Sequence, residues 1–347
     1  MTKQKNTLKE VMRFVLPLAL GGILLAFLYR KMDWLTIKRI WEDDLDYKFL
    51  LLSLLFGLFA NVIRGLRWDL LVEPVVGQGE PLPRKGNAIF TVLGSYTVNM
   101  LIPRSGELWR CAEYKRYEQM SFSTLLGTLI NDRLADVISL GLILVAVVLG
   151  NQDFFWNFFA GNPEQVVKLQ SLLFSPWLYL IVLVFIVGSI LGYRFLKAHP
   201  NNKISQIVRS IILGVASIKS MKERGQFILY SFLIWIGYFL YFYVAFWAFP
   251  FTRELGVGTA LVAFALSSMS ALVPVQAGMG AWHAAVIITF TTFGMATQPA
   301  KDFAFIVHTA QTLWITFVGL LAIIALPIIN RHYTRVRTAP ADTPVSY

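Results

Sequence analysis

Long uncharged apolar stretches, separated by short charged segments, make up most of the chain. A helix rises about 1.5 Å per residue, so crossing a hydrocarbon core of about 30 Å takes about 20 residues. Stretches of that length predict six full transmembrane helices, at residues 12–30, 48–68, 121–150, 175–196, 225–250 and 303–330. The pattern therefore predicts an all-α, polytopic membrane protein.

The basic residues lie mostly between these stretches and predict the orientation of the chain. Lys and Arg gather at 1–13, 194–224 and 331–337, whereas 151–175 contains only Lys168. Because cytoplasmic loops carry the excess of Lys and Arg, we expect both termini in the cytoplasm of a multi-pass protein of the cell (cytoplasmic or inner) membrane. We expect residues 1–337 to form a single transmembrane domain, followed by a disordered cytoplasmic tail at 338–347.

Composition agrees with this class and argues against others. Apolar residues make up 56% of the chain and charged residues 15%, against about 45–50% and about 25% in soluble domains. The net charge of +11 (31 − 20) comes from the loops, so nucleic acid is not an expected partner. Cys111 is the single cysteine, which excludes an intramolecular disulfide. ATPase, zinc-protease and serine-hydrolase motifs are missing, and we expect no cofactor, no metal and no enzymatic activity.

Two uncharged stretches do not fit as single spans. One begins at Gly86 and ends at Pro103, before the charged run 104–118. The other runs from Leu255 to Ala300 and is broken by Pro274, Gly278 and Gly280, where a helix would stop. Each is predicted to be a re-entrant helical hairpin, at 86–118 and 255–300.

The two breaks also predict an internal repeat. Pro103 and Pro274 are 274 − 103 = 171 residues apart, about half the chain, and each follows a run of small and polar residues. The first hairpin enters from the inside and the second from the outside. Repeat 1 (about 48–150) and repeat 2 (about 225–330) therefore form an inverted-topology pair, as in many transporters, whose binding sites lie where broken helices meet.

Ionisable side chains in the first half are the first candidates for function, because such groups are costly inside a membrane. They are Arg64, Arg67, Arg104, Arg110, Arg133, Glu107, Glu113, Asp132 and Asp136. Asp132 and Asp136 are four residues apart and share a helical face. Arginine forks in a hydrated cavity would bind a phosphate bidentately while the acids hold them in place. The alternative is a set of Arg–carboxylate pairs that only locks helices together.

The second half contributes a nearly neutral set of candidates. Gln276, His283, His308 and Gln311 are its polar residues of interest. Together with the charged half, they suit a substrate with a polar head and an apolar tail. The alternative is that these histidines only hydrogen-bond neighbouring helices.

Four motifs carry a resemblance to a known family. They are Arg64-x-x-Arg67-Trp68, Asn99-x-x-x-Pro103-x-x-Gly106-Glu107-x-x-Arg110, Asn131-Asp132-Arg133-x-x-Asp136 and Pro274-x-x-x-Gly278-x-Gly280-x-x-His283. Over roughly residues 10–330 the chain resembles the flippase-like membrane family that includes the lysylphosphatidylglycerol synthase transmembrane region. The second-half motif differs from the family pattern, which often has Pro-Gly-Gly and a Glu where this chain has Ala277-Gly278 and Trp282-His283. The resemblance implies translocation of lipid between leaflets; synthase members carry a soluble aminoacyl-transfer domain after the membrane region, which we do not expect here.

The sequence thus predicts a lipid translocase for a phosphate-bearing lipid or lipid-linked precursor. Its partners would be a membrane phospholipid or a polyprenyl-phosphate-linked lipid, with a partner synthase or a homo-oligomer as further partners. Two alternatives stay open: a membrane-embedded lipid-modifying transferase with Glu107 or Asp132 as base, and a non-catalytic membrane subunit of a lipid or glycan synthesis complex. The predicted headgroup-binding residues are Arg64, Arg67, Asn99, Pro103, Arg104, Gly106, Glu107, Arg110, Asn131, Asp132, Arg133, Asp136, Gln276, Gly278, Gly280, His283, His308 and Gln311.

Overall fold

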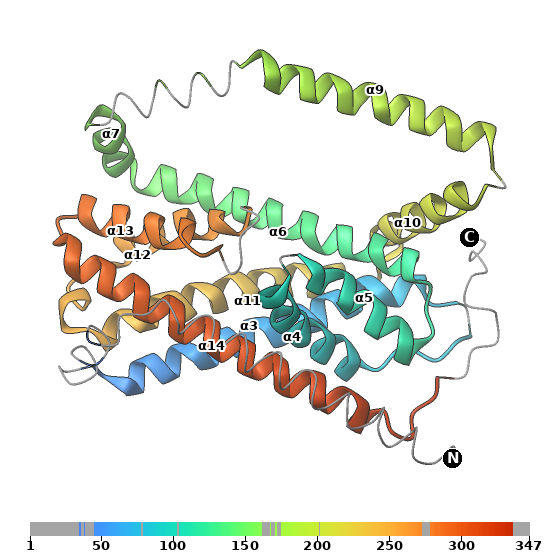
Figure 1. Ribbon diagram of the computed structural model, residues 1–347, viewed down its shortest axis with the longest axis horizontal. Coiled ribbons are helices and arrows are strands. Elements are labelled where there is room, and N and C mark those ends of the chain that lie inside the picture. The colour runs from blue at the N-terminus through green and yellow to red at the C-terminus, as the bar shows by residue number, and fades with distance from the viewer. Residues whose placement is uncertain are drawn as a thin grey trace.

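The computed structural model describes most of the chain as a set of packed helices (Figure 1). The residues it describes are 35, 38, 45–77, 79–102, 104–161, 167, 171, 175–200, 202–272 and 278–335. In that part of the chain every regular element is a helix, as predicted. The predicted span at 12–30, the tail at 338–347, and Pro103, Pro274 and Gln276 lie outside the described residues.

Most of the helices follow the apolar stretches of the sequence, and the charged run 104–118 is helical as well. The α-helices are α3 (Tyr47–Val72), α4 (Lys85–Leu101), α5 (Ser105–Glu118), α6 (Phe122–Gly150), α7 (Gln152–Gly161), α9 (Pro176–Ala198), α10 (Lys203–Ser220), α11 (Arg224–Tyr243), α12 (Val257–Ser268), α13 (Ala281–Thr292) and α14 (Thr297–Ile329). Short 3-10 helices are η1 (Glu73–Val75), η2 (Val244–Ala248), η3 (Pro250–Thr252) and η4 (Met269–Leu272).

Within the described residues, 4 helices are long and apolar enough to cross a membrane. They cover Tyr47–Val75, Phe122–Gly150, Arg224–Ala248 and Thr297–Ile329. These match the spans predicted at 48–68, 121–150, 225–250 and 303–330. The stretch predicted at 175–196 forms α9, which lies apart from the other labelled helices in Figure 1.

Each of the two predicted hairpins consists of a pair of shorter helices separated by a break. Helices α4 and α5 pack against each other, as do α12 and α13. The first break contains Ile102, which is extended (φ −131°), and Arg104, which is left-handed (φ 64°). The second break ends at Gly280 (φ 85°), where α13 begins. Helix α4 ends at Leu101, two residues before Pro103 in the sequence, and η4 after α12 ends at Leu272, two residues before Pro274. These are the positions at which Pro and Gly predict that a helix ends.

Helix α4 packs closely against α3 and α14 at positions where those two helices have glycine. A Cβ on Gly65 of α3 would lie 2.6 Å from the Cα of Ile89 in α4. A Cβ on Gly319 of α14 would lie 2.5 Å from the carbonyl oxygen of Leu93, one turn further along α4. Small residues permit this close approach of helix backbones, which dispersion forces then stabilise. The first hairpin is therefore held tightly by spans from both halves of the chain.

A buried polar cluster fixes one end of α14 to the first hairpin. Asn87 donates to Glu118 Oε1 at 2.5 Å and exchanges hydrogen bonds with Asn330 (3.1 and 2.7 Å). Tyr333 donates to Glu118 Oε2 at 2.8 Å, and burial together with this hydrogen bond raises the pKa of the Tyr333 phenol to about 12. Arg335 is 2% exposed and donates to the carbonyl oxygen of Glu118. This cluster was not predicted from the sequence.

Candidate functional site

Two arginines of α3 project toward α6 and meet its carboxylates. Arg67 Nη2 lies 2.6 Å from Asp132 Oδ1 and 2.6 Å from Asp136 Oδ1. Arg64 Nη1 lies 2.6 Å from Asp136 Oδ2. The arginines are three residues apart on α3 and the aspartates four apart on α6, so each pair occupies one helical face. The predicted shared face of Asp132 and Asp136 is confirmed.

Asp132 joins three helices. Its second oxygen, Oδ2, accepts from Arg110 of α5 at 3.2 Å, and the Asp132 side chain is fully buried. The guanidinium of Arg110 lies over the ring of Trp68 of α3, 4.2 Å from its centroid. Arg110 Nε has no hydrogen-bond partner among the described residues. Asp132 thus ties α3, α5 and α6 together, while Arg110 keeps one donor unused.

Arg133 forms the accessible edge of this cluster. Its Nε lies 2.8 Å from Glu107 Oε1 of α5, and its Nη1 lies 3.2 Å from Asp136 Oδ2. The side chains of Arg133 and Glu107 are 40% and 26% exposed, whereas that of Arg67 is fully buried. We call this set the ionic network: Arg64, Arg67, Arg110, Arg133, Glu107, Asp132 and Asp136.

A hydrogen-bond chain that the sequence analysis missed extends the ionic network to α11 and α4. Arg64 Nε donates to the hydroxyl of Tyr238 at 3.1 Å, and that hydroxyl donates to Asn61 Oδ1 at 2.7 Å. Since the Tyr238 proton is used there, Tyr96 donates to the Tyr238 oxygen at 3.1 Å. Tyrosines of membrane helices usually lie at the interface. The position of Tyr238 inside the apolar span Arg224–Ala248 was therefore the available signal.

Arg104 connects the first hairpin break to η4 of the second hairpin. It precedes α5, and its Nη2 donates to the carbonyl oxygen of Ala271 in η4 at 3.2 Å. These two residues are 167 positions apart in the sequence. Beside Arg104, the amide of Gly106 donates to Asn99 Oδ1 at 2.8 Å, and a Cβ on Gly106 would clash with the carbonyl oxygen of Ser95. Asn99 and Gly106 therefore shape the break, and Arg104 reaches the other hairpin.

Several predicted residues have partners elsewhere. Asn131 donates to the carbonyl oxygens of Gly214 and Val215 in α10, at 3.1 and 2.9 Å. Gln311 donates to the carbonyl oxygen of Tyr241 at 2.8 Å. Both residues therefore connect helices and lie outside the ionic network.

Glu113 and the candidates of the second half have neighbours outside the ionic network. Glu113 pairs with Arg116 of its own helix at 2.8 Å, and so does not join the ionic network. Gly278 and Gly280 both have positive φ, which glycine adopts without strain. His283 and His308 lie against each other, with ring centroids 4.4 Å apart.

The charges of the site do not cancel. The ionic network with Arg104 contains five arginines and three carboxylates, so 5 − 3 leaves two positive charges. Arg64, Arg67 and Arg110 are buried and bound to aspartates. Arg104 is exposed and Arg133 is partly exposed. An anion approaching the site would therefore meet these two arginines first.

Comparison with protein families shows which family the chain resembles over most of its length. The family described as "Lysylphosphatidylglycerol synthase TM region" matches residues 14–319. The chain belongs to this family. The lysylphosphatidylglycerol synthase TM-region match covers the whole ionic network, and it indicates a multi-pass membrane protein tied to lipid metabolism or translocation. No curated protein matches the chain, and no solved structure matches it.

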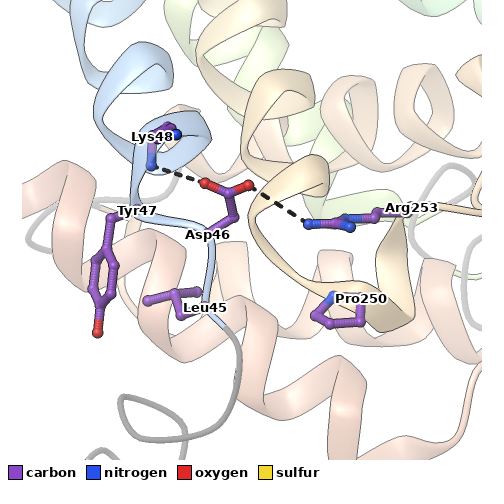
Figure 2. A pocket seen from close by; sticks show the side chains of 6 residues that line it. All are labelled: Leu45, Asp46, Tyr47, Lys48, Pro250 and Arg253. Carbon is purple, nitrogen blue, oxygen red and sulfur yellow. Dashed lines mark hydrogen bonds and ion pairs between the residues drawn. The ribbon is translucent and has the colours of Figure 1, made fainter.

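A surface hollow lies at the other end of α3 (Figure 2). Its volume is about 580 Å³, and its lining residues are Leu45, Asp46, Tyr47, Lys48, Pro250 and Arg253. Asp46 accepts from the amide of Lys48 at 3.1 Å and pairs with Arg253 at 3.7 Å. Lys48 and Arg64 are 16 residues apart on one helix, or about 24 Å. The hollow is therefore separate from the ionic network.

Replacing Asp132 tests whether the ionic network stabilises the fold. Asp132→Asn leaves Arg67 and Arg110 buried with too little negative charge. Breaking a buried pair in this way costs about 3–5 kcal/mol. We expect a clearly lower midpoint of thermal unfolding in detergent and less folded protein.

The matched control is Glu113→Gln in α5. Its partner Arg116 is 41% exposed, and exposed pairs contribute about 0–1 kcal/mol. The control should unfold like the wild type. An Asp132→Asn protein that also unfolds like the wild type would refute the stabilising role.

Proposed function

We propose that the protein is a translocase that moves a phosphate-bearing lipid or lipid-linked precursor between leaflets of the cell membrane. The observation that carries the proposal is the contact of Arg104 with Ala271, which joins the two hairpin breaks beside a site with excess positive charge. Broken helices that meet inside a membrane commonly form the substrate sites of transporters. Family membership supports a lipid as the substrate.

The chemistry of the accessible residues favours a phosphate headgroup. Arg104 and Arg133 carry planar guanidinium forks, which bind phosphate oxygens bidentately and stay charged when partly desolvated. Beneath them, the pairs with Asp132 and Asp136 hold the buried arginines in place. A phospholipid or a polyprenyl-phosphate-linked lipid provides such a head together with an apolar tail. A partner synthase or a second copy of the chain would be a further partner.

A membrane transferase is the second candidate, and the geometry favours it less. Both oxygens of Asp132 already accept hydrogen bonds from arginines, which makes this carboxylate a poor base. Glu107 is the more accessible acid, but it lies beside Arg133. The non-enzymatic function is therefore our proposal, with the scaffold of a synthesis complex as the remaining alternative.

The proposed architecture is an inverted repeat of six spans and two hairpins, with both termini cytoplasmic. Its support is the pattern of helix packing across the two halves. Helix α4 of the first hairpin packs against α14, the last span of the second half, and α12 of the second hairpin packs against α6, the last span of the first half. Such reciprocal packing is what two interlocked copies of one unit produce.

Translocation in liposomes tests the function. Reconstituted protein should move labelled phosphatidylglycerol or undecaprenyl phosphate between leaflets without changing its mass, and should leave a neutral glycolipid in place. A hydrogen bond between charged groups contributes about 1.5–3 kcal/mol. Arg104→Gln and Arg133→Gln should therefore each slow movement about 10-fold or more, because they remove the accessible forks.

Arg116→Gln is the matched control, since Arg116 is exposed on α5 and pairs with Glu113. Its rate should equal that of the wild type. A changed lipid mass would establish the transferase instead. Unchanged mass without movement would favour the scaffold, and equal transport of the neutral glycolipid would exclude a phosphate requirement.

Cysteine accessibility tests the inverted repeat. Single cysteines replace Lys85, Lys115, Arg253 or Lys301 on a Cys111→Ala background, because Cys111 is the single native cysteine and is buried. Positions 85 and 115 should label from the cytoplasmic side, and 253 and 301 from the external side. Labelling of 253 and 301 from opposite sides would contradict the second hairpin.

A further inference from the structure

A buried carboxyl group near the end of α3 has no ion-pair partner in the described part of the chain. Asp69 is 2% exposed, and its Oδ1 makes no hydrogen bond to any described residue. None of the ion pairs among the described residues includes Asp69. It therefore differs from Asp132 and Asp136, whose charges are neutralised by arginines. An unpaired charge in such a place is costly.

A second polar group without a partner, from α5, lies beside Asp69. The Tyr114 side chain is fully buried, and its hydroxyl makes no hydrogen bond within the described residues. The carboxyl and the hydroxyl are close enough to interact electrostatically. Trp68, the neighbour of Asp69 on α3, packs against the Tyr114 ring with the centroids 4.8 Å apart. Two such groups at one contact between helices call for a small polar ligand.

The charges around Asp69 are mainly negative. The charged groups that face it are Glu73 of η1, Lys85 of α4 and Glu118 of α5. Glu118 is fully buried, and its carboxylate accepts hydrogen bonds from Asn87 and Tyr333. Lys85 is exposed. A negative charge on Asp69 would thus be repelled by two carboxylates and attracted only by one solvated ammonium.

The other elements packed against α3 provide no counter-charge. These elements are α6, α10, α11, α14 and η2. Their ionisable residues are Asp132, Arg133 and Asp136 on α6, Lys203, Arg209 and Lys219 on α10, Arg224 and the tyrosines 230, 238, 241 and 243 on α11, and Lys301, Asp302 and His308 on α14. Those of α6 belong to the ionic network, and those of α10 are exposed.

The remaining ionisable groups of α3, α4 and α5 also have other places. On α3, Arg64 and Arg67 are bound to the aspartates of α6, and Lys48 lies at the opposite end. On α4, Tyr96 bonds Tyr238. Those of α5 are Glu107 and Arg110 in the ionic network, Glu113 and Arg116 in their own pair, the exposed Lys115, the half-buried Tyr117 and the buried Cys111.

We propose that Asp69 and Tyr114 form a proton-binding site that holds α5 against α3 while the proton is bound. With the proton, the Asp69 carboxyl is neutral, donates to the Tyr114 oxygen and adds no charge beside Glu73 and Glu118. Loss of the proton leaves a buried anion without a partner. Because water has to reach that anion, α5 would then move away from this part of α3.

The proton site is connected to the ionic network through one aromatic ring. The Trp68 ring contacts Tyr114 and also lies under the guanidinium of Arg110, which is 4.2 Å from its centroid. Tyr114 and Arg110 are four residues apart on α5 and share a helical face. Movement of α5 at Asp69 would therefore reach Arg110 and its partner Asp132. The site is defined without reference to any lipid, so it stands or falls apart from the proposed function.

Infrared spectroscopy tests the bound proton. The difference between spectra at pH 5 and pH 9 should contain the carbonyl stretch of a protonated carboxylic acid that is missing in Asp69→Asn. Tyr114→Phe keeps the ring and removes the hydroxyl, so it should change the pH at which this band disappears. Glu113→Gln, on the same helix, is the control and should leave the band unchanged. A difference spectrum that is the same in Asp69→Asn as in the wild type would refute the site.

The native cysteine tests the movement of α5. Cys111 is fully buried and packs in one apolar cluster with Trp68 and Tyr114. Thiol modification itself becomes faster with pH, so its rate is divided by the rate in Asp69→Asn at the same pH. The ratio should rise about tenfold between pH 5 and pH 9, which corresponds to about 1.4 kcal/mol. A charged Asp69 disfavours a nearby thiolate, so electrostatics alone would lower the ratio.

A second reference, Asp69→Leu, guards against a misfolded first variant, because Leu has nearly the shape of Asp and does not titrate. Division by either reference should give the same rise, and division by Glu113→Gln should give a constant ratio. A constant ratio with both references, together with a clear Asp69 band, would show that proton release does not move α5. Neither measurement contains a lipid, so a negative result leaves the translocation assay to be judged by itself.

Discussion

The buried contact between Arg67 and Asp132 is the interaction on which the other features of the site depend. Both side chains are fully buried, and they lie on two helices that are long and apolar enough to cross a membrane. A charge in that setting is costly unless an opposite charge neutralises it. The pair therefore fixes how α3 and α6 face each other, and Arg110 and Asp136 then have to satisfy the remaining oxygens and guanidinium groups.

This constraint divides the arginines into buried ones that stabilise the fold and more exposed ones at the edge of the site. The buried arginines Arg64, Arg67 and Arg110 cannot leave their aspartates without exposing a buried ion, so they form a rigid floor. Arg133 and Arg104 sit at its edge, and Arg104 contacts the second hairpin through Ala271. The small residues at Gly65 and Gly319 hold α4 close to α3 and α14. In our account, the buried pairs hold the site rigid while Arg104 and Arg133 receive the headgroup.

Much of the fold could be predicted because the membrane imposes simple rules. Length and hydropathy located α3, α6, α11 and α14, and Pro and Gly located both breaks. Residue spacing predicted that Asp132 and Asp136 share a face, but spacing could not tell which arginines are neutralised, because that depends on how three helices rotate against one another. For the same reason Asn131 and Glu113 were grouped with the site, although they bind α10 and Arg116. Tyr238, Glu118 and Arg335 were missed because their partners are distant in sequence.

The most direct test of the central claim, that the edge arginines bind phosphate while the buried ones stabilise the fold, is ligand-induced thermal stabilisation in detergent. A ligand that binds the folded state raises its stability in proportion to RT ln(1 + [L]/Kd). Phosphatidylglycerol should raise the unfolding midpoint of the wild type, and a neutral glycolipid with the same chains should not. The double variant Arg104→Gln, Arg133→Gln should lose the lipid-induced shift, measured against its own lipid-free midpoint, and that lipid-free midpoint should fall less than that of Asp132→Asn. A double variant that keeps the full shift, or a neutral lipid that produces the same shift, would contradict the account.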